Sequence, residues 1–128
     1  MGDARLASRM EAIRERLVAL RNSSEDIEGC ALVSSDGFML VNLLPPGLPE
    51  EDVAAMCASL LHFAEKIVKN LEKGEFEMEV VMGERGYTVI VNVGTEAVLM
   101  ILARRKARLG FIYYMTKKAA QDLAEIVK

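Results

Sequence analysis

Hydrophobic and polar positions alternate along the chain with two different periods, which predict helices and strands. Apolar residues spaced three to four apart predict helices over residues 3–22, 49–72 and 109–127. Alternating or continuous apolar runs between turn sequences predict strands over residues 30–33, 38–41, 76–82, 87–93 and 97–103. The order is therefore α-β-β-α-β-β-β-α. This order predicts a mixed α/β protein, and more specifically one of the α+β type.

Short turns connect the consecutive strands, so we expect antiparallel pairing into one five-stranded sheet covered on both faces, in a single domain over residues 1–128. In the first hairpin, Asp36-Gly37 is a strong turn signal because glycine accepts the positive φ of a tight turn. Its two dense apolar runs predict strands with little exposure on either face. The continuous apolar run 97–103 predicts a central strand.

The predicted helix over residues 49–72 has more apolar surface than one core requires. A helix that covers a single core needs an apolar arc of about 100°, and the apolar positions here spread over a wider arc. The helix therefore needs a second apolar neighbour besides its own sheet. Segment 76–82 follows it, with Phe76 and Val80 alternating with glutamates, which is typical of a half-buried strand.

Composition and charge narrow the function classes. The chain has 128 residues and a net charge of −3, and a mildly acidic chain is a poor candidate for nucleic-acid binding. No stretch approaches the ~20 apolar residues that span a membrane, so we expect no membrane insertion and a cytoplasmic protein. Cys30 and Cys57 lie within apolar patterns and favour buried thiols, with a regulatory disulfide as the minority alternative.

Motifs that carry chemistry are missing from the sequence. There is no GxxxxGK[ST], GxGxxG, HExxH or GxSxG motif, and the chain has one histidine. Glu75, Glu77 and Glu79 alternate along a predicted strand, which favours a solvated face over a carboxylate cluster. We therefore expect no catalytic residue, no metal site and no cofactor.

Two groups of charged residues are candidates for binding a protein partner. The first lies on the polar face of the predicted second helix, and the second precedes the last helix, where the helix dipole disfavours cations. The basic run fits either a solvated connector or a patch for anions or an acidic partner. The candidate partner-binding residues are His62, Lys66, Lys69, Arg104, Arg105, Lys106 and Arg108.

Four segments together resemble the Roadblock / dynein light chain domain family, over about residues 10–127. They are GCALVSSDGFML, DVAAMCASLLHFAEKIVKNL, GEFEMEVVMGERGYTVIVNVG and AVLMILARRKARLGFIYYMTKKAAQDLAEIV. The resemblance implies a profilin-like fold with the second helix on one face of the sheet and the other two helices on the opposite face. It also implies a homodimer built on paired second helices and on self-pairing of segment 76–82. The expected interface residues are Met56, Leu60, Phe63, Ile67, Phe76, Met78, Val80 and Met82.

In function, the resemblance implies a non-enzymatic regulator or scaffold, often of a Ras-like small GTPase. One alternative is a structural adaptor subunit of a larger assembly that does not respond to nucleotide, as in dynein light chains. A small-ligand sensor ranks last because few polar groups are available to line a pocket. Many family members have Asp or Asn before the last helix, where this chain has residues 104–108, so the partner specificity of the family does not transfer directly.

Overall fold

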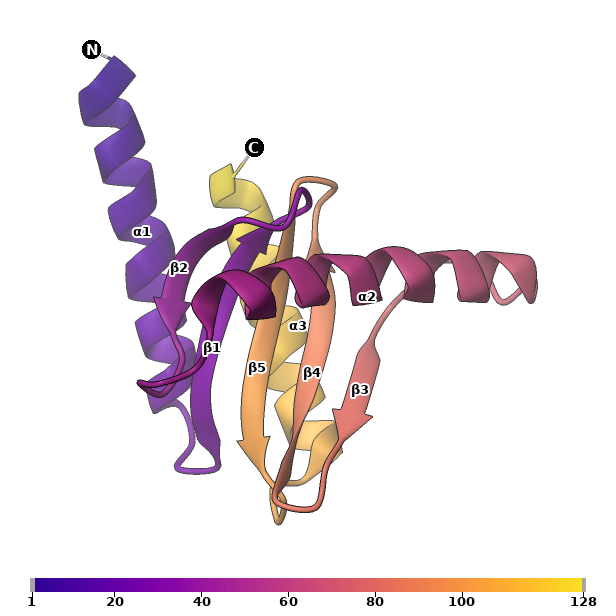
Figure 1. Ribbon diagram of the computed structural model, residues 1–128. Helices are drawn as coiled ribbons and strands as arrows, with labels where there is room; N and C mark the ends of the chain where they lie inside the picture. The colour runs from indigo at the N-terminus through magenta and orange to yellow at the C-terminus, as the bar shows by residue number, and fades with distance from the viewer. Residues whose placement is uncertain (1, 128) are drawn as a thin grey trace.

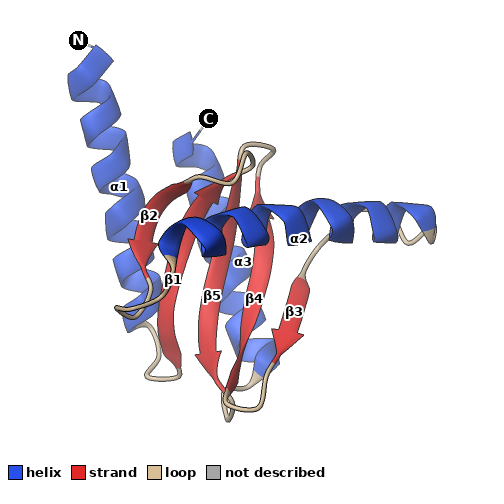
Figure 2. Cartoon of the chain, viewed as in Figure 1, coloured by secondary structure: helices blue, strands red, loops and turns tan. Residues whose placement is uncertain are grey.

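The structure, a computed structural model, describes residues 2–127, which form one antiparallel sheet with helices on both faces (Figures 1 and 2). The elements are α1 (Gly2–Asn22), β1 (Ile27–Ser34), β2 (Met39–Leu43), α2 (Glu50–Asn70), β3 (Glu79–Met82), β4 (Gly86–Val93), β5 (Ala97–Arg104) and α3 (Leu109–Val127). The predicted α-β-β-α-β-β-β-α order and the five-stranded antiparallel sheet are confirmed.

The strand order across the sheet is β2-β1-β5-β4-β3. Hairpins join β1 to β2, β3 to β4 and β4 to β5, and the long-range pairing of β1 with β5 closes the sheet, with Leu32 opposite Leu99. The prediction of 97–103 as a central strand is confirmed. Strands β2 and β3 form the two edges.

Two hydrophobic cores lie on opposite faces of this sheet. Helices α1 and α3 cover one face and share a core with β1, β4 and β5, in which Leu17, Ile112 and Leu123 are fully buried. Helix α2 crosses the other face alone, over a smaller core that includes Cys57, Leu61 and Ile90. The distribution of one helix on one face and two on the other is as the resemblance implied.

Small side chains bring α2 close to the sheet. Its buried residues include Ala54, Ala58 and Ala64, which let the helix backbone approach the strands. Acidic residues occupy its first turn, where the positive end of the helix dipole favours them. The helix ends at Asn70, and Glu72 and Gly74 then adopt positive φ values of 55° and 87°.

The structure corrects two predicted strands. Strand β3 begins at Glu79, so Phe76 and Met78 precede the regular strand. Strand β2 begins at Met39, and Phe38 lies in the preceding turn with its side chain exposed. The expectation that both strands of the first hairpin are covered on both faces holds for β1 but is wrong for β2, because β2 is an edge strand.

Candidate interaction surfaces

Helix α2 has a second apolar face that its own chain leaves open. Five large apolar side chains, spaced three or four residues apart, have exposed fractions between 38% and 65%. At this spacing they line one side of the helix. We call these residues the α2 stripe: Met56, Leu60, Phe63, Ile67 and Leu71. The stripe accounts for the wide apolar arc of the sequence, because the arc consists of a buried face and this exposed one.

The carboxyl-terminal part of α2 extends past the edge of the sheet. Figure 1 shows the helix crossing β1, β5 and β4 and continuing beyond β3. Ala64 is the last buried residue of the helix, and nothing after it in α2 is buried. Ile67 and Leu71 therefore present apolar surface on a segment that lies outside the body of the subunit.

Beside α2, the sheet face is hollow and apolar. In Figure 1 the lower part of this face has no helix in front of it. An open hollow of about 220 Å³ lies between the helix and the strands. Its lining comes from α2, from the segment before α2 and from three strands: Leu44, Leu48, Val53, Met56, Cys57, Leu60, Val81, Thr88, Ile90, Met100 and Leu102.

The side chains of segment 76–82, which was predicted to pair with its copy, do not share one face of the sheet. Val80 and Met78 pack against the core under α1 and α3, and Met82 has the same strand parity as Val80. Phe76 packs instead against the α2-side core. Val81 points to the α2 side and lines the apolar hollow, and the sequence prediction missed it. The adjacent β-branched pair at residues 80 and 81 was a signal that both faces of β3 are apolar.

Glu79 also lies on the α2 side, at the start of β3 opposite Ile90. Within residues 2–127, its Oε1 atom is buried and has no hydrogen-bond partner. Burial raises the pKa of this carboxyl above its ordinary value of 4.5. Burial also raises the pKa of the Cys57 thiol to about 12, and the nearby charge of Glu79 adds to that increase. Glu79 is therefore half-buried and departs from the predicted solvated face, whereas Glu75 and Glu77 are exposed as predicted.

We expect Glu79→Gln to stabilise the chain at neutral pH. A raised folded-state pKa means that the native state binds its proton more tightly, so the free energy of unfolding falls as pH rises from about 4.5 through the folded pKa. The neutral amide avoids this loss. The gain should be at most about 1 kcal/mol, since part of the side chain stays in water.

Urea unfolding at about pH 4 and pH 7.5, at matched protein concentration, checks this expectation. The difference between variant and parent should be small at the lower pH and larger at the higher pH. Glu75→Gln, at an exposed neighbour, is the control and should show no such dependence. An equal effect of Glu79→Gln at both pH values would contradict the prediction.

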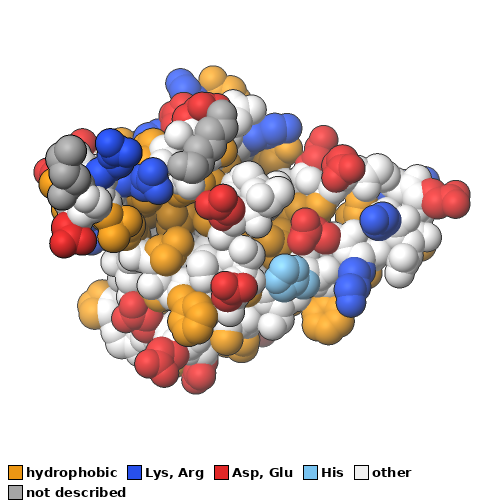
Figure 3. Space-filling view, turned by 90° about the horizontal axis from the view of Figure 1, so that it is seen from above, with side chains coloured by type: hydrophobic (Ala, Val, Ile, Leu, Met, Phe, Trp, Pro, Cys, Tyr) orange, Lys and Arg blue, Asp and Glu red, His pale blue; other side chains and the backbone are white. Residues whose placement is uncertain are grey.

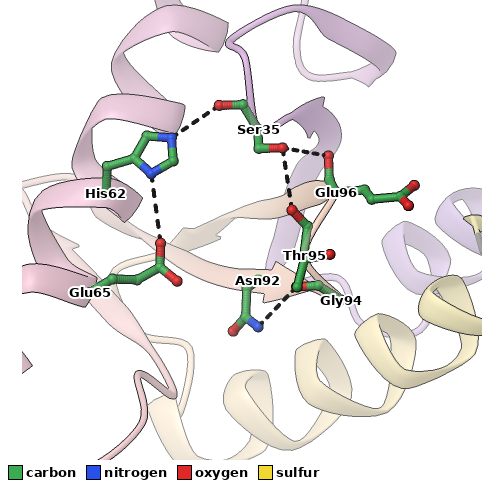
Figure 4. A network of polar contacts seen from close by, with 7 residues as sticks. All are labelled: Ser35, His62, Glu65, Asn92, Gly94, Thr95 and Glu96. Atoms are coloured by element: carbon green, nitrogen blue, oxygen red, sulfur yellow. Dashed lines mark hydrogen bonds and ion pairs between the residues drawn. The ribbon is translucent and has the colours of Figure 1, made fainter. Parts of the chain in front are cut away.

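The histidine of α2 belongs to a polar network at one end of the sheet (Figure 4). His62 Nε2 donates to the Ser35 carbonyl at 3.1 Å, and Nδ1 lies 3.7 Å from Glu65 Oε1. The Ser35 hydroxyl donates in turn to the Glu96 carbonyl at 2.9 Å. The network connects α2 to the β1–β2 and β4–β5 turns. One nitrogen of His62 is therefore engaged within the chain, although the side chain remains half exposed.

The polar side of α2 carries both charge signs. Figure 3 shows acidic and basic side chains along the helix, with the histidine between them. An open hollow of about 780 Å³ lies between the end of the helix and the connector to β3. The structure thus brings three predicted partner-binding residues to one hollow, which is lined by His62, Glu65, Lys66, Lys69, Gly74, Glu75 and Phe76.

The basic run, residues 104–108, lies at the end of β5 and in the loop before α3. Two of its four cations donate hydrogen bonds to neighbouring loops. Arg104 Nε donates to the Glu25 carbonyl at 3.0 Å. An Arg105 guanidinium nitrogen donates to the carbonyls of Gly83 and Glu84 at 3.2 and 3.1 Å. These two arginines therefore fix neighbouring turns, while the other two cations of the run remain exposed. The two predicted groups of binding residues are not brought together.

The two cysteines are separated by the sheet. Cys30 belongs to the core under α1 and α3, and Cys57 belongs to the core under α2. Both are free and buried, and burial raises their thiol pKa values to about 11 and about 12. The thiols are therefore protonated at neutral pH and unreactive. Among residues 2–127, no three His, Cys, Asp or Glu side chains form a group that would hold a metal ion.

No helix in the described part of the chain is long and apolar enough to cross a bilayer.

Comparisons with known proteins agree with this architecture. The chain is 31% identical over 109 residues to the uncharacterized protein MJ1340 of Methanocaldococcus jannaschii, covering 85% of this chain and 95% of the relative. Gliding protein mglB from Thermus thermophilus superposes with a TM-score of 0.81 at 25% identity, over 92% of this chain and 90% of the other.

A structure described as MglB with tetrameric arrangement has the same TM-score of 0.81 at 27% identity, over 92% of this chain and 89% of that one. The Roadblock/LC7 domain pattern matches residues 13–103, from the buried part of α1 to the end of the central strand. With this match over most of the sheet, the chain belongs to the Roadblock/LC7 domain family.

Proposed function

We propose that this chain forms a two-fold homodimer and that the dimer is a non-enzymatic regulator or scaffold of a Ras-like small GTPase. The observation that carries the dimer is the α2 stripe on a helix that extends past β3. Apolar side chains of this size and number in contiguous exposure are typical of an interaction site.

In the proposed dimer, the projecting helix of one copy covers the apolar hollow of the other. A rotation about an axis beside β3 carries the end of α2 from one copy over the sheet face of the other. There Phe63 and Ile67 of each copy meet an apolar hollow that its own subunit leaves uncovered. A two-fold contact uses the same patch on both subunits, so each favourable contact occurs twice.

The outer edge of β3 supports the same arrangement. Strand β3 pairs with β4 on one side only, and its other edge carries unpaired backbone groups. An antiparallel β3 from the second copy would satisfy these groups and extend the sheet across both subunits. In that arrangement Val81 joins the apolar interface, whereas Val80 stays in the core of its own subunit.

Family membership supports the GTPase partner, because the Roadblock resemblance implies regulators and scaffolds of Ras-like GTPases. The likeness to MglB structures at 25% and 27% identity supports a role of the same kind. We propose the polar side of α2 as the contact surface. Lys66 and Lys69 are exposed there, beside a hollow large enough to receive a partner loop.

The experiment is a binding titration against the Ras-like GTPases of the host genome, loaded with GDP or with a non-hydrolysable GTP analogue. We expect binding that differs between the two states, weakened about tenfold by Lys66→Glu with Lys69→Glu. Arg5→Glu with Arg9→Glu, an equal charge change on exposed α1 positions, is the matched control and should change the affinity less than about twofold.

Absence of binding in both nucleotide states would contradict the GTPase proposal. Binding of equal strength in both states would favour the structural adaptor instead. The dimer is tested independently by its mass in solution, so failure of one part of the proposal leaves the other measurable.

A further inference from the structure

One long segment of the chain has basic residues and no acidic ones. Residues 97–121 contain six of the 16 basic residues and none of the 19 acidic ones. The remainder of the chain therefore has 10 basic and 19 acidic residues. The segment therefore carries positive charge that no acidic residue within it offsets, and α1, on the same side of the sheet, adds five arginines against three carboxylates.

Part of this charge forms a surface with aromatic residues on the outer side of α3. Arg108, Phe111, Tyr114 and Lys118 are spaced three or four residues apart and so follow one stripe of the helix. Phe111 and Tyr114 have exposed fractions of 46% and 61%. We call these four residues the α3 face.

The two cations of the α3 face, Arg108 and Lys118, form no salt bridge with another residue of the described range 2–127. Other basic groups nearby are engaged: the Arg105 guanidinium holds the β3–β4 turn, and the Lys117 ammonium lies 5.5 Å from the centre of the Tyr113 ring. The α3 face therefore combines two cations outside any salt bridge with two exposed aromatic rings.

We propose that the α3 face is a docking site for a short acidic protein segment that carries apolar anchor residues. Exposed Tyr, Phe and Arg side chains are the groups that protein interfaces favour. From residue 108 to residue 118 the face measures about 15 Å along the helix. That length matches about five residues of an extended peptide or one short helix.

The size of the face favours a compact segment over an extended polyanion. A membrane surface or a nucleic-acid duplex reaches well beyond about 15 Å and would make most of its contacts outside the α3 face. A short acidic segment can instead place both its carboxylates and its apolar residues on the four residues of the face.

This site is separate from the surface of the proposed function. Helix α3 lies on the opposite side of the sheet from α2 (Figure 1), so neither the α2 stripe nor the β3 edge is covered by a ligand there. A dimer would carry two such sites and hold an acidic protein while its α2 side is occupied.

Panning the intact protein against a phage-displayed library of random peptides about 12 residues long tests the site. We expect enrichment of peptides that combine Asp and Glu with aromatic or aliphatic residues. Arg108→Glu with Lys118→Glu should weaken the selected peptides at least about tenfold in fluorescence anisotropy, and Phe111→Ser with Tyr114→Ser by a similar factor. Lys66→Glu with Lys69→Glu, the same charge change on α2, should alter affinity less than about twofold.

All four changes are at exposed positions, and circular dichroism with light scattering verifies that fold and oligomeric state are retained. The proposal is overturned if the selected peptides are not acidic, or if the Arg108→Glu/Lys118→Glu variant binds them with unchanged affinity. It is also overturned if vesicles of equal phosphatidylcholine and phosphatidylglycerol, or single-stranded DNA, bind the α3 face more tightly than the peptides do.

Discussion

Ile67→Asp should convert the proposed dimer into monomers by raising its dissociation constant about a thousandfold. Ile67 belongs to the α2 stripe and has an exposed fraction of 57% in the single chain. Burying a large aliphatic side chain contributes about 2 kcal/mol. A two-fold interface loses that contribution twice, and about 4 kcal/mol corresponds to a factor of about 10³ in affinity. Light scattering coupled to size exclusion at micromolar concentration measures the change.

Leu6→Asp is the matched control for this prediction. Leu6 lies on α1 with an exposed fraction of 56%, so the substitution changes an equally exposed aliphatic residue away from α2. It should leave the dimer intact. Val80→Asp is unsuitable as a test, because Val80 packs against the core under α1 and α3 and its loss would unfold the subunit. A parent protein that is monomeric at micromolar concentration would refute the dimer.

The spacing of apolar residues predicted the fold well for elements whose apolar pattern is regular over their whole length. Strand β5 is covered on both sides and has a continuous apolar run, so its central position could be read from composition alone. Helix α2 has a buried face and an exposed apolar face, and together these account for its wide apolar arc. Four residues of the α2 stripe had been predicted as interface residues, and all four are exposed in the single chain: Met56, Leu60, Phe63 and Ile67.

The edge of the sheet was harder to predict because a period of two assumes a regular strand. Phe76 and Met78 precede β3, so their side chains turn to different faces although their spacing is two. The partial burial of Glu79, whose Oε1 atom has no contact with water, has no sequence signal, since alternating glutamates normally mark a solvated face. The internal hydrogen bonds of Arg104 and Arg105 also depend on loops far away in sequence.

Substituting alanine for Gly86 should have the largest effect on folding of any small change in the β3–β4 region. A Cβ atom at Gly86 would lie 2.5 Å from the Ala103 carbonyl oxygen on the neighbouring strand β5. No positive φ is required there, so the need for glycine is steric and comes from the close approach of two backbones. Backbone atoms cannot move aside as a flexible side chain can, and we expect a loss of about 3 kcal/mol in the free energy of unfolding.

Gly83, in the same turn, separates this steric effect from a general intolerance of the turn to substitution. A Cβ there would lie 3.3 Å from the Gly86 carbonyl oxygen, a contact that a small shift relieves. Gly83→Ala should therefore cost less than about 1 kcal/mol in urea unfolding. Equal losses for Gly83→Ala and Gly86→Ala would contradict the steric explanation. Because Gly86 sets the spacing of β4 against β5, its substitution should also displace β3 and weaken the dimer, whereas Gly83→Ala should leave the dimer unchanged.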